Sequence, residues 1–487
     1  MHVLPKNVGP IHLIGIGGIG MSGVASILHA LGFRVQGSDA GAGANVVRLR
    51  QQGIEVHIGH DPSHLQDVSV VVISSAVKGD NVELMEARRR RIPVVKRADM
   101  LAEIMRLRPS IAVGGTHGKT TTTSLVASLL DAGGCDPTVV SGGIINAYGT
   151  NARPGQGAWL VAEADESDGT FVRLPATISV VTNIDPEHLE HYGSFDKLKE
   201  SFLAFVENIP FYGLGVVCFD HPEVRALYGT LTDRRLIRYG FCQDADLRAT
   251  NLRFSPSGTT FDVTLSQRIQ DFWPSTPYGP EMKDLFLPLL GEHNASNALA
   301  AIACGLELGL SQDAIRAGLA AFSGVERRFT RVGSVGGVHI IDDYAHHPAE
   351  IRAVLRTARQ VNPKRVLAVV QPHRYSRLAS LFEDFADAFE GADHVIVAPV
   401  YAAGEEPIPD VTHTRLASAL ESKGHSVHVL GGRDDLAPLL TRIAKEGDYV
   451  VCMGAGDITA WAKELPKCLF QSVARECLTI EQDRVCA

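Results

Sequence analysis

The stretch Ile111-Ala112-Val113-Gly114-Gly115-Thr116-His117-Gly118-Lys119-Thr120 decides the fold that we expect for this chain of 487 residues. A short apolar strand leads into a glycine-rich turn, and a helix is predicted from about Thr120 to Ala132, where two glycines end it. This arrangement suits a nucleoside triphosphate, because backbone N–H groups surround the phosphates, the lysine reaches them and the threonine hydroxyl is offered to Mg²⁺. We therefore expect ATP to bind at Gly114, Gly115, Thr116, His117, Gly118, Lys119, Thr120 and Thr121.

This phosphate loop is a shortened variant of the usual pattern. The strict spacing requires a glycine at position 113, where the chain has Val113. The alternative is a purely structural glycine turn before a helix that happens to start with Lys-Thr. Its placement between a strand and a helix disfavours that alternative.

Short apolar strands alternate with helical stretches along most of the chain, which predicts an α/β fold with parallel, doubly wound sheets. We expect a Rossmann-like N-terminal domain at 1–108, a central P-loop ATPase domain with a mixed sheet at 109–325, and a C-terminal α/β domain at 326–487. The segments from Thr250 to about Leu287 look antiparallel and are expected at a sheet edge. Residues from Cys468 onward have no clear partner element, so a mobile tail is expected there.

Composition narrows the functional classes. The net charge of -9 argues against general nucleic-acid binding, which needs a basic face. No apolar stretch approaches the roughly 20 residues of a membrane span, so no membrane insertion is expected. The eight cysteines form no C-x-x-C pair, the N-terminus has no signal-peptide shape, and a cytoplasmic protein with reduced thiols is the expectation.

A second glycine cluster lies near the N-terminus. Gly15-Ile16-Gly17-Gly18-Ile19-Gly20 matches G-x-G-x-x-G after a strand. Asp39 follows about twenty residues later in the sequence, which is the spacing of a carboxylate that binds a ribose hydroxyl. The same geometry serves any pyrophosphate at a helix N-terminus, including that of a UDP-sugar, and a tight turn alone would also fit. The fingerprint itself does not choose among these ligands.

Acidic and histidine residues follow two strands of the central unit. Glu163-Ala164-Asp165-Glu166-Ser167-Asp168 stands where open α/β sheets place ligands, and carboxylates there suit Mg²⁺, although a solvated acidic turn is the alternative. His188 also follows a strand and is either a ligand of a second metal ion or a structural histidine. His293 and Asn294 open an alanine-rich helix, where Asn294 either caps the helix or faces an adenine edge.

The third unit has two polar strings after its strands. Asp342-Asp343-Tyr344-Ala345-His346-His347-Pro348 is the first, and His373-Arg374-x-x-Arg377 is the second. The two arginines could bind a carboxylate through paired N–H donors, or they could simply be solvated.

Taken together, these strings resemble the Mur ligases of peptidoglycan synthesis from about Ile11 to Trp461. The strings are Gly15–Gly23, Gly114–Thr122, Glu163–Asp168, His293–Asn297, Asp343–Pro348 and Gln371–Arg377. Tripeptide-recycling members resemble Gly-Ile-Cys-Gly-Thr at the first loop, whereas this chain has Gly15-Ile16-Gly17-Gly18-Ile19. That difference favours members that add L-alanine to UDP-N-acetylmuramate.

The resemblance implies ATP and Mg²⁺ or Mn²⁺ as cofactors, UDP-N-acetylmuramate and L-alanine as partners, and a monomer or weak homodimer. The implied ATP site also includes His293, Asn294, Arg327 and Asp343, and the implied metal ligands are Thr120, Glu163 and His188. The implied catalytic residues are Lys119, Glu163, His188, His346, Arg374 and Arg377. The implied UDP-substrate residues are Gly15, Gly17, Gly18, Ile19, Gly20, Met21, Asp39, Ser74, Ser75, Ala76, Ser167 and Asp168.

One departure from the family concerns the metal. Several Mur ligases carry a carbamylated lysine nine residues after a Tyr/His-Gly pair, and here Gly193 plus nine is Phe202. We therefore expect no carbamyl-lysine. The tail beyond about Lys467 also lies outside the resemblance.

The implied reaction is an ATP-dependent ligation. The lactyl carboxylate takes the γ-phosphate of ATP, the amine of L-alanine attacks the acyl phosphate, and phosphate leaves. Two other classes stay open from the residues alone. One is a nicotinamide-dependent oxidoreductase that uses the first glycine cluster, and the other is a UDP-sugar-sensing ATPase that forms no peptide bond.

Overall fold

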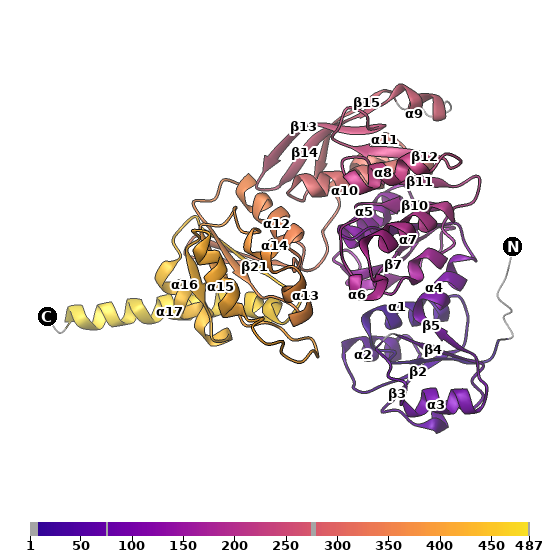
Figure 1. Cartoon of the computed structure of the whole chain (residues 1–487), viewed down its shortest axis with the longest axis horizontal. Helices are drawn as coiled ribbons and strands as arrows, with labels where there is room; N and C mark the ends of the chain where they lie inside the picture. The colour runs from indigo at the N-terminus through magenta and orange to yellow at the C-terminus, as the bar shows by residue number, and fades with distance from the viewer. Residues whose placement is uncertain (1–7, 75, 274–278, 486–487) are drawn as a thin grey trace. The chain divides into compact units, whose positions relative to one another are not determined.

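The computed structural model describes residues 8–485 except 75 and 274–278, and it has the predicted mixed α/β fold, with three sheets (Figure 1). The chain divides into two compact units. The first holds the chain up to Arg253 with Thr259–Pro288 and His293–Val325, and the second holds Phe254–Gly258, Leu289–Glu292 and the chain from Glu326.

The first sheet of the first unit is parallel, with the strand order β3-β2-β1-β4-β5. Because β1 is followed by β2 on one side and pairs with β4 on the other, the strand order reverses at β1, and a crevice is expected at its carboxyl end. The glycine cluster at Gly15 begins at that end. The elements are β1 (Ile11–Ile14), α1 (Ile19–Ala30), β2 (Val35–Asp39), α2 (Ala44–Gln51), β3 (Glu55–Ile58), η1 (Pro62–Leu65), β4 (Val70–Ile73), α3 (Val82–Arg89), β5 (Val94–Lys96) and α4 (Arg97–Met105).

The second sheet of the first unit has ten strands in the order β15-β14-β13-β12-β11-β10-β6-β9-β7-β8. Its centre is parallel, whereas β7–β8 and β14–β15 are antiparallel, so the predicted mixed sheet with an antiparallel edge is confirmed. The strands are β6 (Ser110–Gly114), β7 (Thr138–Ile145), β8 (Thr150–Arg153), β9 (Leu160–Glu163), β10 (Ile178–Val181), β11 (Leu214–Cys218), β12 (Leu236–Gly240), β13 (Leu247–Ser255), β14 (Gly258–Leu265) and β15 (Glu281–Leu287). The helices are α5 (Lys119–Ala132), η2 (Thr170–Arg173), α6 (Leu189–Tyr192), α7 (Phe195–Glu207), α8 (Pro222–Thr230), α9 (Gln267–Phe272), α10 (Glu292–Glu307) and α11 (Gln312–Ala320).

The sheet of the second unit has six strands in the order β16-β17-β21-β18-β19-β20, and separate apolar clusters cover its two faces. Its strands are β16 (Thr330–Val335), β17 (Val338–Asp343), β18 (Val366–Val370), β19 (His394–Val397), β20 (Val427–Val429) and β21 (Tyr449–Met453). Its helices are α12 (Pro348–Gln360), α13 (Tyr375–Ser380), α14 (Phe382–Ala386), α15 (His413–Ser422), η3 (Arg433–Asp435), α16 (Leu436–Ile443) and α17 (Ile458–Val485).

The C-terminal residues are helical. A mobile tail with no clear partner element was expected from Cys468, and the backbone there continues helix α17 as far as Val485. Apolar residues of the same helix, among them Trp461, Leu465 and Leu469, are buried in the core of the second unit. The first turns of α17 are therefore packed against the second unit, and the residues that follow continue the same helix.

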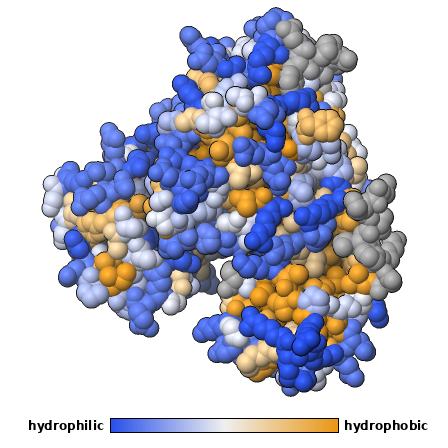
Figure 2. All heavy atoms as spheres, turned by 45° about the vertical axis from the view of Figure 1, so that its right-hand side comes forward, coloured by the Kyte–Doolittle hydropathy of each residue, from blue (hydrophilic) through white to orange (hydrophobic). Residues whose placement is uncertain are grey.

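The surface and the cysteines agree with the composition. Hydrophilic residues are spread over the face that Figure 2 shows, interrupted by smaller hydrophobic areas. Among the described residues, no helix has both the length and the apolar character needed to span a membrane. The cysteines that the structure describes are free thiols.

Candidate nucleotide and ligation site

The phosphate loop joins the carboxyl end of β6 to the start of α5, and two of its glycines have left-handed backbones. Gly115 has φ +133° and Gly118 has φ +83°. A Cβ atom on Gly115 would lie 1.9 Å from Thr182 Oγ1, and one on Gly118 would lie 2.7 Å from Asn297 Oδ1. Only glycine fits both positions without a shift of the neighbours.

The segment after β10 supports the loop from one side. The Thr116 N–H donates to the Asn183 carbonyl at 3.1 Å, and the His117 N–H donates to Asn183 Oδ1 at 2.7 Å. His117 Nε2 also lies 3.5 Å from Asp185 Oδ2. Strand β10 is the parallel neighbour of β6, so the two strand ends meet at the same edge of the sheet.

The Lys119 ammonium group is enclosed by oxygen atoms. Its Nζ donates to the carbonyls of Gly115 at 2.7 Å and Thr116 at 3.0 Å, and it lies 2.7 Å from Glu166 Oε2. Burial lowers the pKa of Lys119, but the facing carboxylates, Glu166 first, outweigh burial and raise that pKa above its ordinary value. Lys119 therefore carries a fixed positive charge. Glu166 belongs to the acidic string of the sequence, but its direction toward Lys119 was not predicted.

Two of the predicted metal ligands lie together. Thr120 Oγ1 donates to Glu163 Oε2 at 2.9 Å, and the Gly142 N–H donates to the same oxygen at 2.7 Å. Thr120 is the second residue of α5 and Glu163 is the last residue of β9. The neighbouring parallel strands β6 and β9 thus bring a hydroxyl and a carboxylate to one point.

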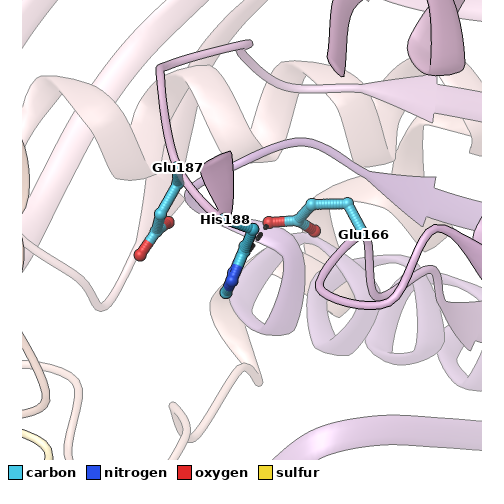
Figure 3. A group of neighbouring side chains, drawn as sticks. All are labelled: Glu166, Glu187 and His188. Carbon is cyan, nitrogen blue, oxygen red and sulfur yellow. Dashed lines mark ion pairs between the residues drawn. The ribbon is translucent and has the colours of Figure 1, made fainter. Parts of the chain in front are cut away.

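The third predicted ligand, His188, is grouped with other carboxylates (Figure 3). The ligand atoms of Glu166, Glu187 and His188 all lie within 4.8 Å of one another. His188 Nε2 is 3.9 Å from Glu166 Oε1, and the backbone of His188 is left-handed at φ +55°. The carboxylate and hydroxyl oxygens fit a hard divalent cation such as Mg²⁺ that is shared with phosphate oxygens. Glu166 links the His188 group to the phosphate loop, because it also contacts Lys119.

Phe202 contributes to the hydrophobic core rather than to this cluster. It is fully buried on α7, and its ring packs 5.0 Å from that of Phe171. A modified lysine at this position would have to replace a core aromatic ring. Donors for a second cation therefore have to come from elsewhere, and Glu166 and Glu187 are the carboxylates beside His188.

The first glycine loop is held by the end of β2. The N–H groups of Gly15 and Ile16 donate to the Ser38 carbonyl at 2.8 and 3.0 Å. The Gly17 N–H donates to Asp39 Oδ2 at 2.8 Å, and the Gly41 N–H donates to Asp39 Oδ1 at 3.2 Å. Both carboxylate oxygens of Asp39 thus accept bonds from backbone amides, so Asp39 shapes the loop itself.

The other residues predicted for the UDP substrate lie at the start of α1 and after β4. Gly18 is the N-cap of α1 without a side-chain cap, Gly20 lies in its first turn, and Ile19 is 56% exposed. The Met21 side chain is buried in the core, so only its backbone is available to a ligand. Ser74 and Ala76 follow β4, which pairs with β1, whereas Ser75 lies outside the described residues.

An arginine that was not predicted lies between the two halves of the first unit. A Cβ atom on Gly20 would lie 3.0 Å from Arg97 Nη1, and Arg97 Nη2 is 3.7 Å from Asp165 Oδ2. Asn151 Nδ2 also donates to the Ile19 carbonyl at 2.8 Å. The glycine loop and the acidic loop are therefore close. The predicted residues Ser167 and Asp168 form the turn that follows, in which the Thr170 N–H donates to Asp168 Oδ1 at 3.0 Å.

His293 and Asn294 are in the first turn of α10, so Asn294 is inside the helix rather than at its cap. His293 is exposed and Asn294 is buried. Asn297 Nδ2 donates to Asn294 Oδ1 at 3.3 Å, and Asn297 is the residue next to Gly118. This contact connects the start of α10 with the phosphate loop.

In the second unit, Asp343 ends β17 and accepts two backbone bonds. The Ala345 N–H donates to Oδ1 and the Phe329 N–H to Oδ2, both at 2.7 Å. Burial raises the pKa of Asp343 to about 6, although Arg328 and the two N–H groups oppose the shift. Arg327 Nη2 donates to the Gly454 carbonyl at 2.6 Å. The predicted Asp343 and Arg327 thus both have partners within their own unit.

His346, Arg374 and Arg377 gather at the carboxyl ends of β17 and β18, around His373. The ring centroids of His346 and His373 are 5.9 Å apart, and Arg377 Nη1 lies 3.4 Å from His373 Nδ1. Arg374 has φ +68° and lies 4.0 Å from Glu405. Burial, together with the adjoining His346 and arginines, lowers the pKa of His373 to about 4. His373 was in the quoted string but was not predicted as a site residue.

Three family models match the chain in succession. The catalytic-domain model of the Mur ligase family matches residues 10–109, the Mur ligase middle-domain model matches residues 113–305, and the Mur ligase glutamate ligase-domain model matches residues 327–456.

Similar proteins cover nearly the whole chain. The UDP-N-acetylmuramate–L-alanine ligase of Chelativorans sp. (strain BNC1) is 57% identical over 465 residues, which are 95% of this chain and 99% of that protein. The ligase of the same name from Brucella ovis is 58% identical over 468 residues, 95% of this chain and 98% of that protein. Among solved structures, the UDP-N-acetylmuramate–alanine ligase MurC of Thermotoga maritima matches with a TM-score of 0.76 and 29% identity, covering 95% of this chain and all of that one.

Proposed function

The chain belongs to the Mur ligase family, and from that premise we propose that it joins L-alanine to the lactyl carboxylate of UDP-N-acetylmuramate with cleavage of ATP. The products would be UDP-N-acetylmuramoyl-L-alanine, ADP and phosphate. Relatives with this name cover 95% of the chain at 57–58% identity. The observation in the molecule that carries the proposal is the phosphate loop with Lys119 beside carboxylates from two strand ends.

The chemistry explains why ATP is needed. A carboxylate does not condense with an amine in water, because it is a poor electrophile with a poor leaving group. Transfer of the γ-phosphoryl group makes an acyl phosphate, whose carbonyl carbon the alanine nitrogen attacks. The C–O bond to phosphate then breaks and inorganic phosphate leaves. The two steps replace one difficult condensation.

In this proposal, Lys119 holds the phosphates of ATP. Its buried, fixed charge would offset the negative charge that the transferring phosphoryl group gains. Thr120 and Glu163, with His188 and Glu166, would hold Mg²⁺, or Mn²⁺ in its place, and the ion would supply charge neutralisation. His293 and Asn294 would lie near adenine, and Arg327 and Asp343 near the rest of ATP.

The first glycine loop would hold the UDP pyrophosphate at the N-terminus of α1. Ser74 to Ala76, Ser167 and Asp168 would complete the nucleotide-sugar site, and Arg97 adds a cation between that loop and the acidic loop. Asp39 contributes by fixing the Gly17 amide of the loop, since its other oxygen accepts the Gly41 N–H.

Arg374 and Arg377 would orient the carboxylate of L-alanine, and His346 is the candidate for handling its amine. We propose domain roles that follow this division: nucleotide-sugar binding at 1–108, ATP chemistry at 109–325 and completion of the site at 326–487. A cytoplasmic monomer or weak homodimer is part of the same proposal.

The test is product analysis after incubation with nucleotide sugar, Mg·ATP and mixed amino acids. We expect one new mass that corresponds to alanine addition, and ADP release that requires both UDP-N-acetylmuramate and L-alanine. ADP release without the amino acid and without a new peptide bond would replace this function with that of a UDP-sugar-sensing ATPase. Turnover that depends on NAD(P)H with ATP irrelevant would replace it with an oxidoreductase.

A further inference from the structure

A buried carboxylate lies behind the first glycine loop, surrounded by imidazoles. Glu83 on α3 is fully buried, and His64 Nδ1 lies 2.7 Å from its Oε1. Its other oxygen, Oε2, lies 3.2 Å from His60 Nδ1 and 3.5 Å from His12 Nε2. His12 is on β1, His60 follows β3 and His64 is on η1. Residues from separate elements thus converge on one oxygen pair, and the proposed chemistry uses none of them.

The surroundings of this cluster are apolar. Ile14, Leu65, Val71 and Leu84 pack in the same layer between α3 and the sheet. Burying a carboxylate with imidazoles in such a layer costs free energy relative to an apolar filling of the same volume. A buried ionic cluster is therefore weak support for stability, and its other known use is to hold one particular arrangement of the backbone.

Ser38 connects the cluster to the glycine loop. The Ser38 hydroxyl donates to Glu83 Oε2 at 2.5 Å, while the Ser38 carbonyl accepts the N–H groups of Gly15 and Ile16. The next residue, Asp39, accepts the N–H of Gly17. Residues 38 and 39 thus fix the three loop amides from one side, and Glu83 fixes Ser38 from the other.

We infer that Glu83 is a positioning residue for the nucleotide-sugar loop, and that it acts through Ser38. The inference rests on the proposed function insofar as the loop at Gly15 binds a nucleoside diphosphate. A loop that binds pyrophosphate through backbone amides loses affinity when those amides move by a fraction of an ångström. Glu83 would therefore affect the nucleotide sugar and leave ATP, which is held by a different loop, unaffected.

The experiment measures UDP and Mg·ADP binding by calorimetry in Glu83→Gln, Ser38→Ala and the double variant. Glu86→Gln is the matched control, because Glu86 lies one turn along the same helix and pairs with the exposed Arg89. We expect UDP affinity to fall roughly tenfold in each of the three, as for a lost hydrogen bond to a charged group. The double variant should be no weaker than Glu83→Gln alone, and Mg·ADP affinity should not change.

In the ligation assay the same variants should raise KM for UDP-N-acetylmuramate and leave kcat and KM for ATP unchanged. Unchanged UDP affinity in Glu83→Gln, or effects of the two substitutions that simply add, would overturn the inference. Equal loss of UDP and Mg·ADP binding would also overturn it, because it would show a general structural role. If Glu83→Gln does not fold, Ser38→Ala carries the test with the same expected split. Failure of the wild-type protein to bind UDP would instead refute the proposed role of the loop.

Discussion

At the scale of single residues, the ammonium group of Lys119 is the feature on which the proposed chemistry depends most. In the structure it is enclosed by two loop carbonyls and Glu166. Phosphate oxygens would offer it the same kind of partner. In the proposed mechanism, Lys119 would therefore be held in position before ATP binds, which is the form of preorganisation that favours catalysis.

We predict that Lys119→Ala lowers Mg·ATP-dependent ligation by at least about a hundredfold, because it removes a preorganised charge from the transferring phosphoryl group. Lys197→Ala is the control, since Lys197 is an exposed helix residue paired with Glu200. ADP release measured with both substrates checks the result. Near wild-type turnover in Lys119→Ala would remove the loop from the mechanism.

Asp343 predicts a pH dependence of stability in the second unit. Its folded-state pKa of about 6 lies above the ordinary value of 3.8. The stability that protonated Asp343 contributes is therefore fully present below pH 3.8 and is lost as pH rises through about 6. The loss amounts to about 3 kcal/mol. Asp343→Asn should remove this slope from urea unfolding curves between pH 4 and 7. Asp434→Asn, at an exposed position, should keep it, and identical slopes in wild type and Asp343→Asn would contradict the prediction.

The sequence predicted most of the strings that the candidate site contains, but not every side chain that the structure adds to it. Glu166 and His373 were inside quoted strings, whereas Arg97 was in none. Their importance depends on side-chain direction: Glu166 turns toward Lys119, and Arg97 lies over Gly20 from a different helix. Such contacts arise from the packing of separate elements and leave no periodic signal in one sequence.

At the scale of elements, alternating apolar runs predicted the α/β arrangement and the strand and helix that flank the phosphate loop. The apolar strand expected at 111–113 is β6 (Ser110–Gly114), and the helix expected from about Thr120 to Ala132 is α5 (Lys119–Ala132). The helix that continues through Cys468 was missed, because its residues after the docked turns lack an amphipathic pattern that would predict it. Register and strand order could not be predicted from local pattern at all.

The turn between β6 and α5 gives a prediction about an element. Gly118→Ala would place a methyl group at φ +83° and 2.7 Å from Asn297 Oδ1, so we expect a loss of about 1–3 kcal/mol in unfolding free energy and weaker Mg·ADP binding. Gly134→Ala is the matched control for Gly118→Ala, because Gly134 has φ +73° but nothing within 4 Å of the added atom. It should cost about 1 kcal/mol and leave Mg·ADP affinity unchanged. Equal Mg·ADP affinity in both variants would contradict the role of the loop geometry.

At the scale of the whole molecule, the chain has two units, each with apolar cores of its own, and the proposed ligands divide between them. The nucleotide sugar and the phosphates of ATP would contact the first unit, and the arginines for L-alanine are in the second. A ligand that binds only one folded unit stabilises that unit by mass action and leaves the other unchanged, unless the two unfold together.

The tryptophans allow this to be measured. Trp461 is the tryptophan of the second unit and is 7% exposed in its core, whereas Trp159 and Trp273 belong to the first unit. In a Trp159→Phe/Trp273→Phe variant, fluorescence reports the second unit alone. UDP at a hundred times its Kd should raise the unfolding free energy of the first unit by about 2.7 kcal/mol, seen as a shifted calorimetric transition. The Trp461 transition should stay in place, because the proposed UDP residues are all in the first unit. If the Trp461 transition moves with UDP by the same amount, the two units unfold as one. UDP bound to the first unit would then stabilise both units, which would contradict the prediction.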